Sequence, residues 1–217
     1  MTIIATVLKS GGDYRPEHVQ ELHSQFGDLP SLCFSDCPVA GVKTLPLKYG
    51  YRSWFSKMEL FRPDAVAEDI LYLDLDTWVI KNLDRYLCDT QFRMLSDFYH
   101  PQRPASGVMY IPHAFKTQVW QGWSRAPEAF MNLCRGDQEV LEQLCGRHVA
   151  RFGAEVKSYK VHVARAGMAG FHALRSKGNG LIPQDTDILC FHGSNARPWM
   201  TPLIRPAPAQ GTDLKPA

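Results

Sequence analysis

Short apolar runs that predict strands alternate with longer segments of helical spacing along most of this chain. Strands are predicted at residues 3–8, 32–34, 70–75, 78–80, 92–95, 108–111 and 188–191. Helices are predicted at residues 16–26, 54–61, 115–123, 126–133 and 138–145. This alternation predicts an α/β fold, in which a mixed, mostly parallel sheet is sandwiched between helices.

The length and composition fit one globular domain. A chain of 217 residues is long enough to bury a sizeable core, and a hydrophobic content of 45% with 21% charged residues is not typical of disorder. We expect residues 1–200 to form a single domain. Four prolines fall in residues 201–217, so that segment is predicted to be a flexible tail.

Charge and segment composition indicate where the protein acts. The net charge, 24 − 22 = +2, does not predict nucleic-acid binding. Residues 1–9 are too short and too weakly basic for a signal peptide, and no run approaches the roughly 18 apolar residues of a membrane span. A cytoplasmic protein without a membrane span is predicted. Its six cysteines lack paired Cys-x-x-Cys spacing, so we expect reduced thiols.

An apolar run at residues 71–77, Leu-Tyr-Leu-Asp-Leu-Asp-Thr, carries two carboxylates one residue apart. In an extended strand Asp74 and Asp76 would point to the same side and converge on one cation. Their hard oxygens suit Mg²⁺ or Mn²⁺, and a bound divalent ion would relieve the repulsion between them. The alternative is a pair of exposed acids at the end of a strand.

A second polar cluster follows the apolar run at 188–191. His192, at the end of that predicted strand, could ligate the same ion, or could be a satisfied turn residue. Gly193 leaves the backbone room for a close turn. Arg197, before Pro198 and Trp199, is a permanent cation that can bind phosphate through two hydrogen bonds.

Several other residue types have an ordinary structural interpretation. The tryptophans at 54, 78, 120 and 123 are expected in packing, with a role as sugar platforms as the alternative. The histidines other than His192 are expected in surface or turn positions. On composition alone, the basic stretch 157–160 is predicted to be a solvated strand edge.

The order of four segments carries a family resemblance. These segments are the Asp-x-Asp at 74–76, Ser-Gly-Val-Met at 106–109, Gly-Asp-Gln at 136–138, and the stretch 192–199. Together they resemble glycosyltransferase family 8, the family of glycogenin and the bacterial lipopolysaccharide galactosyl- and glucosyltransferases, over roughly residues 1–200. Residues 51–61 and 158–160 are similar to a compact bacterial and phage branch of that family.

The resemblance implies a GT-A fold, a UDP-sugar or related donor, a divalent ion, and retention of anomeric configuration. It implies metal ligands at Asp74, Asp76 and His192; nucleotide contacts at Leu8, Tyr14 and Asp36; a donor-binding cation at Lys57; sugar contacts at Asp137 and Gln138; a wall at Ser106 and Gly107; and donor contacts at Gly193 and Arg197. The family usually has Lys where Arg197 stands, and the spacing from His192 differs from that of glycogenin-like members.

The predicted function is therefore metal-dependent transfer of a hexose from a nucleotide sugar to an acceptor hydroxyl. The acceptor is left open between a glycan, a small metabolite, a protein side chain and, for a viral gene, hydroxymethylated DNA. Two alternatives use the same residues. One is a nucleotide-sugar-binding module without catalysis, and the other is a nucleotidyltransferase of related fold.

Overall fold

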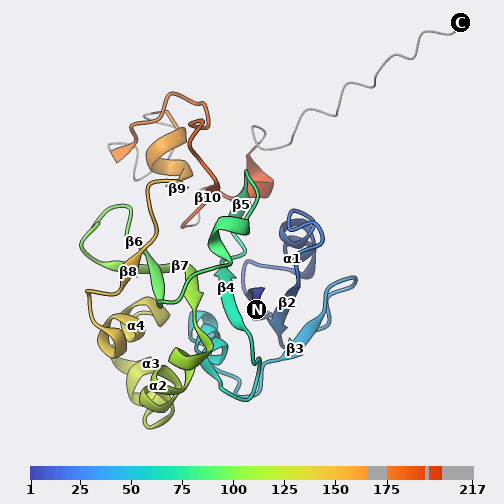
Figure 1. Cartoon of the computed structure of the whole chain (residues 1–217), viewed down its shortest axis with the longest axis vertical. Coiled ribbons are helices and arrows are strands. Elements are labelled where there is room, and N and C mark those ends of the chain that lie inside the picture. The colour runs from blue at the N-terminus through green and yellow to red at the C-terminus, as the bar shows by residue number, and fades with distance from the viewer. Residues whose placement is uncertain (166–174, 194–195, 202–217) are drawn as a thin grey trace, which may run out of the picture.

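The centre of the molecule is a seven-stranded sheet with the order β3-β2-β1-β4-β7-β6-β8 (Figure 1). It is seen in a computed structural model that describes residues 1–165, 175–193 and 196–201. The strands are β1 (Thr2–Leu8), β2 (Ser31–Ser35), β3 (Thr44–Pro46), β4 (Asp69–Leu73), β6 (Arg93–Ser96), β7 (Pro104–Ile111) and β8 (Ala150–Arg151). Strands β3, β2, β1 and β4 are parallel, β7 is antiparallel to β4 and β6, and β8 is parallel to β6.

A smaller sheet adjoins the end of β4. It contains β5 (Thr77–Val79), β10 (Ile188–Cys190) and β9 (Val156–Ser158), in the order β5-β10-β9. Strand β10 pairs antiparallel with β5 and parallel with β9. The pairing of β5 with β10 brings the C-terminal part of the chain to the turn that follows β4.

Helices cover both faces of the large sheet. Figure 1 shows α2, α3 and α4 grouped together, away from α1. The helical segments are α1 (Pro16–His23), α2 (His113–Ser124), α3 (Pro127–Leu133), α4 (Asp137–Cys145), the 3₁₀ helices η1 (Ser53–Phe61), η2 (Asp84–Tyr86) and η5 (Pro198–Met200), and a π-helical turn, η3 (Tyr159–Val163).

Alternating side chains of the central strands feed two apolar cores. On one face, Ile3 and Tyr72 pack with Trp123 of α2. On the other face, Ile4 packs with Val19 of α1. The predicted architecture, a mostly parallel sheet between helices, is confirmed.

The strands that the sequence analysis did not predict are β3, β8 and β9. They are two or three residues long, and β3 and β8 are only partly buried, so neither carries a local apolar pattern. The predicted helix at 54–61 is instead a 3₁₀ helix. Its residues 55–61 are all buried, so packing on every side, and not one apolar face, sets its geometry.

The basic stretch 157–160 was predicted to be a solvated strand edge, and that prediction is wrong. All four of its residues are buried, because β9 pairs with β10 and Tyr159 stacks on Phe191 with ring centroids 4.7 Å apart.

Three composition-based expectations concern the cysteines, a membrane span and the C-terminal tail. The six cysteines are all free thiols, as expected. Within the described residues, no helix is long and apolar enough to cross a membrane. The tail predicted at 201–217 lies outside the described residues from residue 202 onward.

Candidate active site

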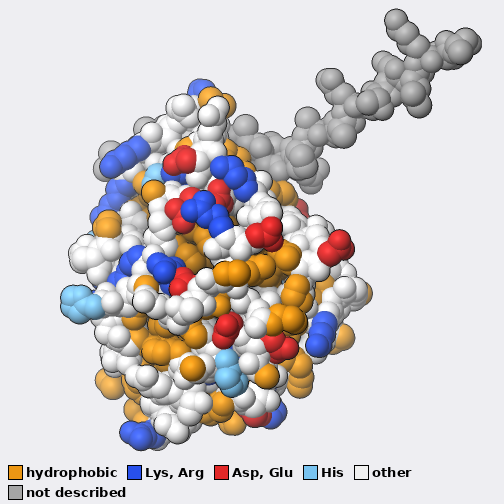
Figure 2. Space-filling view, viewed as in Figure 1, with side chains coloured by type: hydrophobic (Ala, Val, Ile, Leu, Met, Phe, Trp, Pro, Cys, Tyr) orange, Lys and Arg blue, Asp and Glu red, His pale blue; other side chains and the backbone are white. Residues whose placement is uncertain are grey.

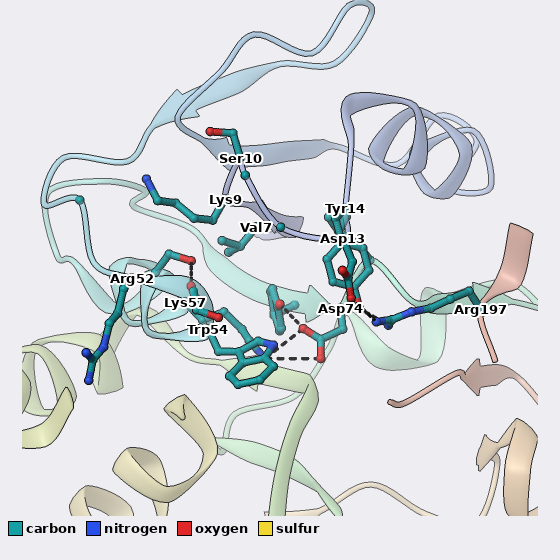
Figure 3. Close-up of a pocket in the computed structure, with 17 residues that line it drawn as sticks. Val7, Lys9, Ser10, Asp13, Tyr14, Arg52, Trp54, Lys57, Asp74 and Arg197 are labelled. Atoms are coloured by element: carbon teal, nitrogen blue, oxygen red, sulfur yellow. Dashed lines mark hydrogen bonds and ion pairs between the residues drawn. The ribbon is translucent and has the colours of Figure 1, made fainter. Parts of the chain in front are cut away.

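Two adjoining cavities, of about 570 and 810 Å³, open where the parallel strands β1 and β4 end. Both are lined by Asp13, Tyr14, Trp54, Lys57, Asp74 and Arg197, so they form one continuous cleft. Figure 3 shows the residues that line the smaller cavity. In the space-filling view, basic and acidic side chains intermingle over the region of β5 and β10 and do not form a basic patch (Figure 2).

The turn between β4 and β5 carries the Asp-x-Asp motif. Strand β4 ends at Leu73, so Asp74 and Asp76 lie in a tight turn and not on a strand as predicted. The backbone N–H and the hydroxyl of Thr77 both donate to the carbonyl of Asp74, at 3.0 and 2.7 Å. The turn, and not strand alternation, therefore brings the two carboxylates to the cleft.

Strand β7 passes close to Asp74 from the other side. The N–H of Asp74 donates to the carbonyl of Gly107 at 2.9 Å, and a Cβ at Gly107 would lie 3.4 Å from Oδ2 of Asp74. Ser106 and Gly107, for which the resemblance implies a wall of the donor site, both line the larger cavity.

Lys57 of η1 connects two carboxylates inside the cleft. Its ammonium nitrogen lies 3.0 Å from Asp74 and 3.1 Å from Asp137, and all three side chains are largely buried. Burial by itself would lower the pKa of Lys57, but Asp137 and Asp74 outweigh it and raise that pKa. Burial raises the pKa of Asp74, and Lys57 only partly opposes this effect. Lys57 is thus a permanently charged cation.

Asp76 is paired with a cation from the C-terminal segment. The Arg197 guanidinium donates to Oδ2 of Asp76 at 2.5 Å, and the hydroxyl of Tyr14 donates to the same oxygen at 2.9 Å. Arg197 also donates to Tyr14 and lies 3.3 Å from Asp13. Burial and the nearby Asp74 raise the pKa of Asp76 to about 6, despite the opposing charge of Arg197.

His192 lines the larger cavity but is held by other groups. Its Nε2 lies 2.7 Å from the hydroxyl of Ser158, and its ring stacks on Phe98 with centroids 5.3 Å apart. Within the described residues, no three His, Cys, Asp or Glu side chains form a group that could hold a metal ion. The structure therefore brings Asp74 and Asp76 to one turn and does not add His192 to them.

The two carboxylates nevertheless fit a hard divalent cation. They are nearby oxygen donors, Asp76 buried and Asp74 partly buried, and burial raises the pKa of both. A divalent ion would offset the cost of keeping both ionised.

The nucleotide contacts that the resemblance implies lie at or near the smaller cavity. Tyr14 lines it, whereas Leu8 is buried and its neighbour Val7 reaches the cavity instead. Asp36 follows β2 and accepts hydrogen bonds from Lys9 at 2.6 Å and from the N–H of Ser10 at 2.8 Å. Burial raises the pKa of Asp36, but these hydrogen bonds outweigh burial and hold that pKa below its ordinary value.

Helix α4 begins at the residues predicted to contact the sugar. Asp137 and Gln138 both line the larger cavity. Gly136 occupies the cap position of the helix, and no side-chain hydrogen bond among the described residues caps it. The carboxylate of Asp137 is directed to Lys57 instead.

Gly193 brings another lysine to the cleft. Its φ of 81° is accessible mainly to glycine, and a Cβ there would lie 2.8 Å from the ammonium of Lys160. Lys160 is buried, and burial and the nearby Arg197 lower its pKa. The sequence signal for Lys160 was its place in the Ser-Tyr-Lys segment at 158–160, which composition alone assigned to the surface.

The position of Trp54 differs from the one that the sequence predicted. It was assigned to packing, but it is 58% exposed and lines both cavities, whereas Trp123 is fully buried as expected. Sequence reasoning treated the tryptophans alike, because nothing in their spacing distinguishes a buried ring from a cavity wall.

Solved structures with a similar fold are known, although the sequence itself has no match. No protein-family model matches the chain, and no curated protein matches its sequence. Among solved structures, the chain is similar to an active-site variant of LgtC (10% identity, TM-score 0.57, covering 94% of this chain and 91% of that one). It is also similar to the glycosyltransferase GlyE of Streptococcus pneumoniae TIGR4 (14% identity, TM-score 0.61, covering 92% and 57%) and to the bifunctional glycosyltransferase WbbM (9% identity, TM-score 0.59, covering 90% and 46%).

These likenesses show that the chain has the GT-A fold of glycosyltransferases. The chain spans nearly the whole of LgtC but only about half of the GlyE and WbbM chains. At this level of identity the likeness concerns the fold, and membership of glycosyltransferase family 8 stays a prediction.

Proposed function

We propose that this protein is a glycosyltransferase that moves a hexose from a nucleotide sugar, most simply a UDP-sugar, to an acceptor hydroxyl. One observation carries the proposal. A continuous cleft at the ends of β1 and β4 places two cations, Lys57 and Arg197, on either side of the paired acids Asp74 and Asp76. The GT-A fold supports it, because ligands of open α/β sheets bind at the carboxyl ends of the strands.

The donor would lie along the cleft. The nucleoside would occupy the smaller cavity, beside the loop that follows β1 and the Lys9–Asp36 pair. The diphosphate would lie between Lys57 and Arg197, because both side chains border both cavities. The hexose would then reach the larger cavity, where Asp137 and Gln138 are placed to orient its hydroxyls.

A divalent ion, Mn²⁺ or Mg²⁺, held by Asp74 and Asp76 would act as a Lewis acid that offsets the charge growing on the departing diphosphate. Such binding requires Arg197 to release Asp76. We expect the freed guanidinium to bind a donor phosphate bidentately.

The chain's own residues supply the remaining catalytic effects. Fixed positive charge in a largely buried cleft stabilises a leaving diphosphate more strongly than the same charge in water. With retention of configuration, the acceptor proton can pass to the leaving phosphate, so no general base is required. Asp137 and Gln138 would then act by holding the sugar.

Asp76→Asn tests the metal assignment. We expect it to abolish Mn²⁺-dependent UDP binding and to leave the fold intact, because one of the two oxygen-donor carboxylates is lost while the shape is kept. Isothermal calorimetry with UDP, with and without Mn²⁺, measures this. Asp64→Asn, an exposed acid outside both cavities, is the matched control. Unchanged Mn²⁺-dependent affinity in Asp76→Asn would show that the ion is not bound there.

Two further assays separate the alternatives. Slow, Mn²⁺-dependent hydrolysis of a UDP-hexose supports a transferase, whereas binding without any turnover indicates a nucleotide-sugar-binding module. Release of pyrophosphate from a nucleoside triphosphate would indicate a nucleotidyltransferase.

A further inference from the structure

Trp54 stands at the boundary between the two cavities with most of its indole uncovered. It is 58% exposed and lines both cavities. Figure 3 shows its ring beside Lys57 and Asp74. A large apolar ring left in contact with water next to charged groups has no role in the core, and such a ring at a cavity wall is typical of a ligand contact.

The local backbone holds this ring out of the core. Ser53, the residue before it, has a φ of 48°, which a non-glycine residue adopts only under strain. The hydroxyl of Ser56 donates to the carbonyl of Ser53 at 2.8 Å and closes the turn. Phe55 is buried against Trp123, with the rings stacked at 6.1 Å. Phe55 therefore faces the core, whereas Trp54, at the start of η1, lines the cleft.

One part of the indole is already in contact with the protein. A Cβ at Gly136 would lie 3.6 Å from Cε3 of Trp54, so the ring packs beside the backbone that leads into Asp137. Within the described residues, no other aromatic ring stacks on Trp54. Tyr14, by contrast, is covered by the Arg197 guanidinium at 4.8 Å and by the edge of Trp199 at 5.9 Å.

We propose that Trp54 determines specificity for the donor sugar, by presenting an apolar surface to the C–H face of the hexose ring. The inference rests on the proposed function and adds a residue to it. The packing beside Gly136, next to Asp137, places one side of the indole at the sugar end of the cleft. Aromatic rings combine a large apolar surface with little entropy to lose, which suits them to hold a sugar face.

The test compares the affinities of Trp54→Ala and Trp54→Phe for UDP, UDP-glucose and UDP-galactose by calorimetry. Trp54→Ala is expected to weaken binding of at least one UDP-hexose about tenfold and to change UDP affinity less than about twofold. Trp54→Phe should retain most of the hexose affinity, because a ring face remains. Leu133→Ala is the control, since Leu133 is 79% exposed and lines neither cavity.

Two results would overturn the assignment. An equal loss of affinity for UDP and UDP-hexose would show that Trp54 contacts the nucleotide. An unchanged affinity for both would show that Trp54 does not contact the donor. The melting temperature of each variant identifies any loss that comes from misfolding. Because misfolding lowers the binding of UDP and UDP-hexose alike, the ratio of the two affinities within one variant then decides the question. If the wild type binds neither UDP nor UDP-hexose, the proposed function fails with these donors and the Trp54 assignment falls with it.

Discussion

Asp137 shows how a single carboxylate can serve both stability and chemistry. It is buried at the first turn of α4, 3.1 Å from the ammonium of Lys57. Lys57 is itself enclosed, so its charge is tolerated only because Asp137 and Asp74 flank it. Removing either acid leaves the buried Lys57 ammonium with one carboxylate partner in place of two.

We expect Asp137→Asn to lower both stability and turnover. The loss of one ion-pair partner should cost about 1–3 kcal/mol of unfolding free energy, because Lys57 keeps Asp74. Donor hydrolysis should fall at least about tenfold, a barrier change near 1.4 kcal/mol. Urea denaturation and a hydrolysis assay measure the two effects. The control is Asp185→Asn, in which an exposed acid outside both cavities loses its ion pair with Lys157. An unchanged rate of donor hydrolysis in Asp137→Asn would show that Asp137 only pairs with Lys57 and has no role in turnover.

At the scale of elements, the docking of α1 on the sheet depends on a neutral imidazole. His23 ends α1 and lies 2.9 Å from the hydroxyl of Thr6 in β1 and 3.1 Å from that of Ser31 in β2. Burial lowers the pKa of His23 to about 4. Between that value and the ordinary pKa of about 6.5, the unfolded chain binds a proton that the folded protein excludes.

This difference predicts acid sensitivity with a definite sign. Stability contributed by His23 is complete above about pH 6.5 and is lost as pH falls toward 4, with a slope of up to about 1.4 kcal/mol per pH unit. His23→Gln should flatten the unfolding free energy between pH 6.5 and 4.5, measured by urea denaturation. The exposed His113→Gln should keep the wild-type slope. An unchanged slope in His23→Gln would assign the acid sensitivity to other groups.

At the scale of the whole molecule, the C-terminal segment returns to the N-terminal loop and closes one side of the cleft. Trp199 stacks on His18 of α1, with ring centroids 3.6 Å apart and planes 5° from parallel. Two residues earlier, Arg197 reaches Asp76 across 121 positions of sequence. The position of the site cation therefore depends on a contact between the two ends of the described chain.

A double-mutant cycle tests this dependence. We expect Trp199→Ala and His18→Ala each to weaken UDP binding several-fold, because the Arg197 segment loses its anchor. The double variant should lose less than the sum, with a coupling of about 0.5–1.5 kcal/mol. Calorimetry measures the affinities, and Met200→Ala, an exposed apolar residue of the same 3₁₀ helix, is the control. Additive losses would show that the stacked rings do not position Arg197.

The sequence by itself determined the α/β class and most of the central strands. Apolar periodicity is a local property, so runs such as 3–8 and 108–111 identify strands without any knowledge of their partners. Most residues that the family resemblance assigned to the donor site also line the cleft, because that resemblance is carried by short motifs that are visible in the sequence.

Only the tertiary structure decided which charges pair and which rings face the cleft. Pairings such as Arg197 with Asp76, Lys57 with Asp137 and Ser158 with His192 join segments far apart in the sequence. Strand β9 was missed because its pairing with β10 has no local pattern. Trp54 is exposed although the residues that follow it, 55–61, are all buried. Such features depend on packing between distant segments, which local periodicity does not encode.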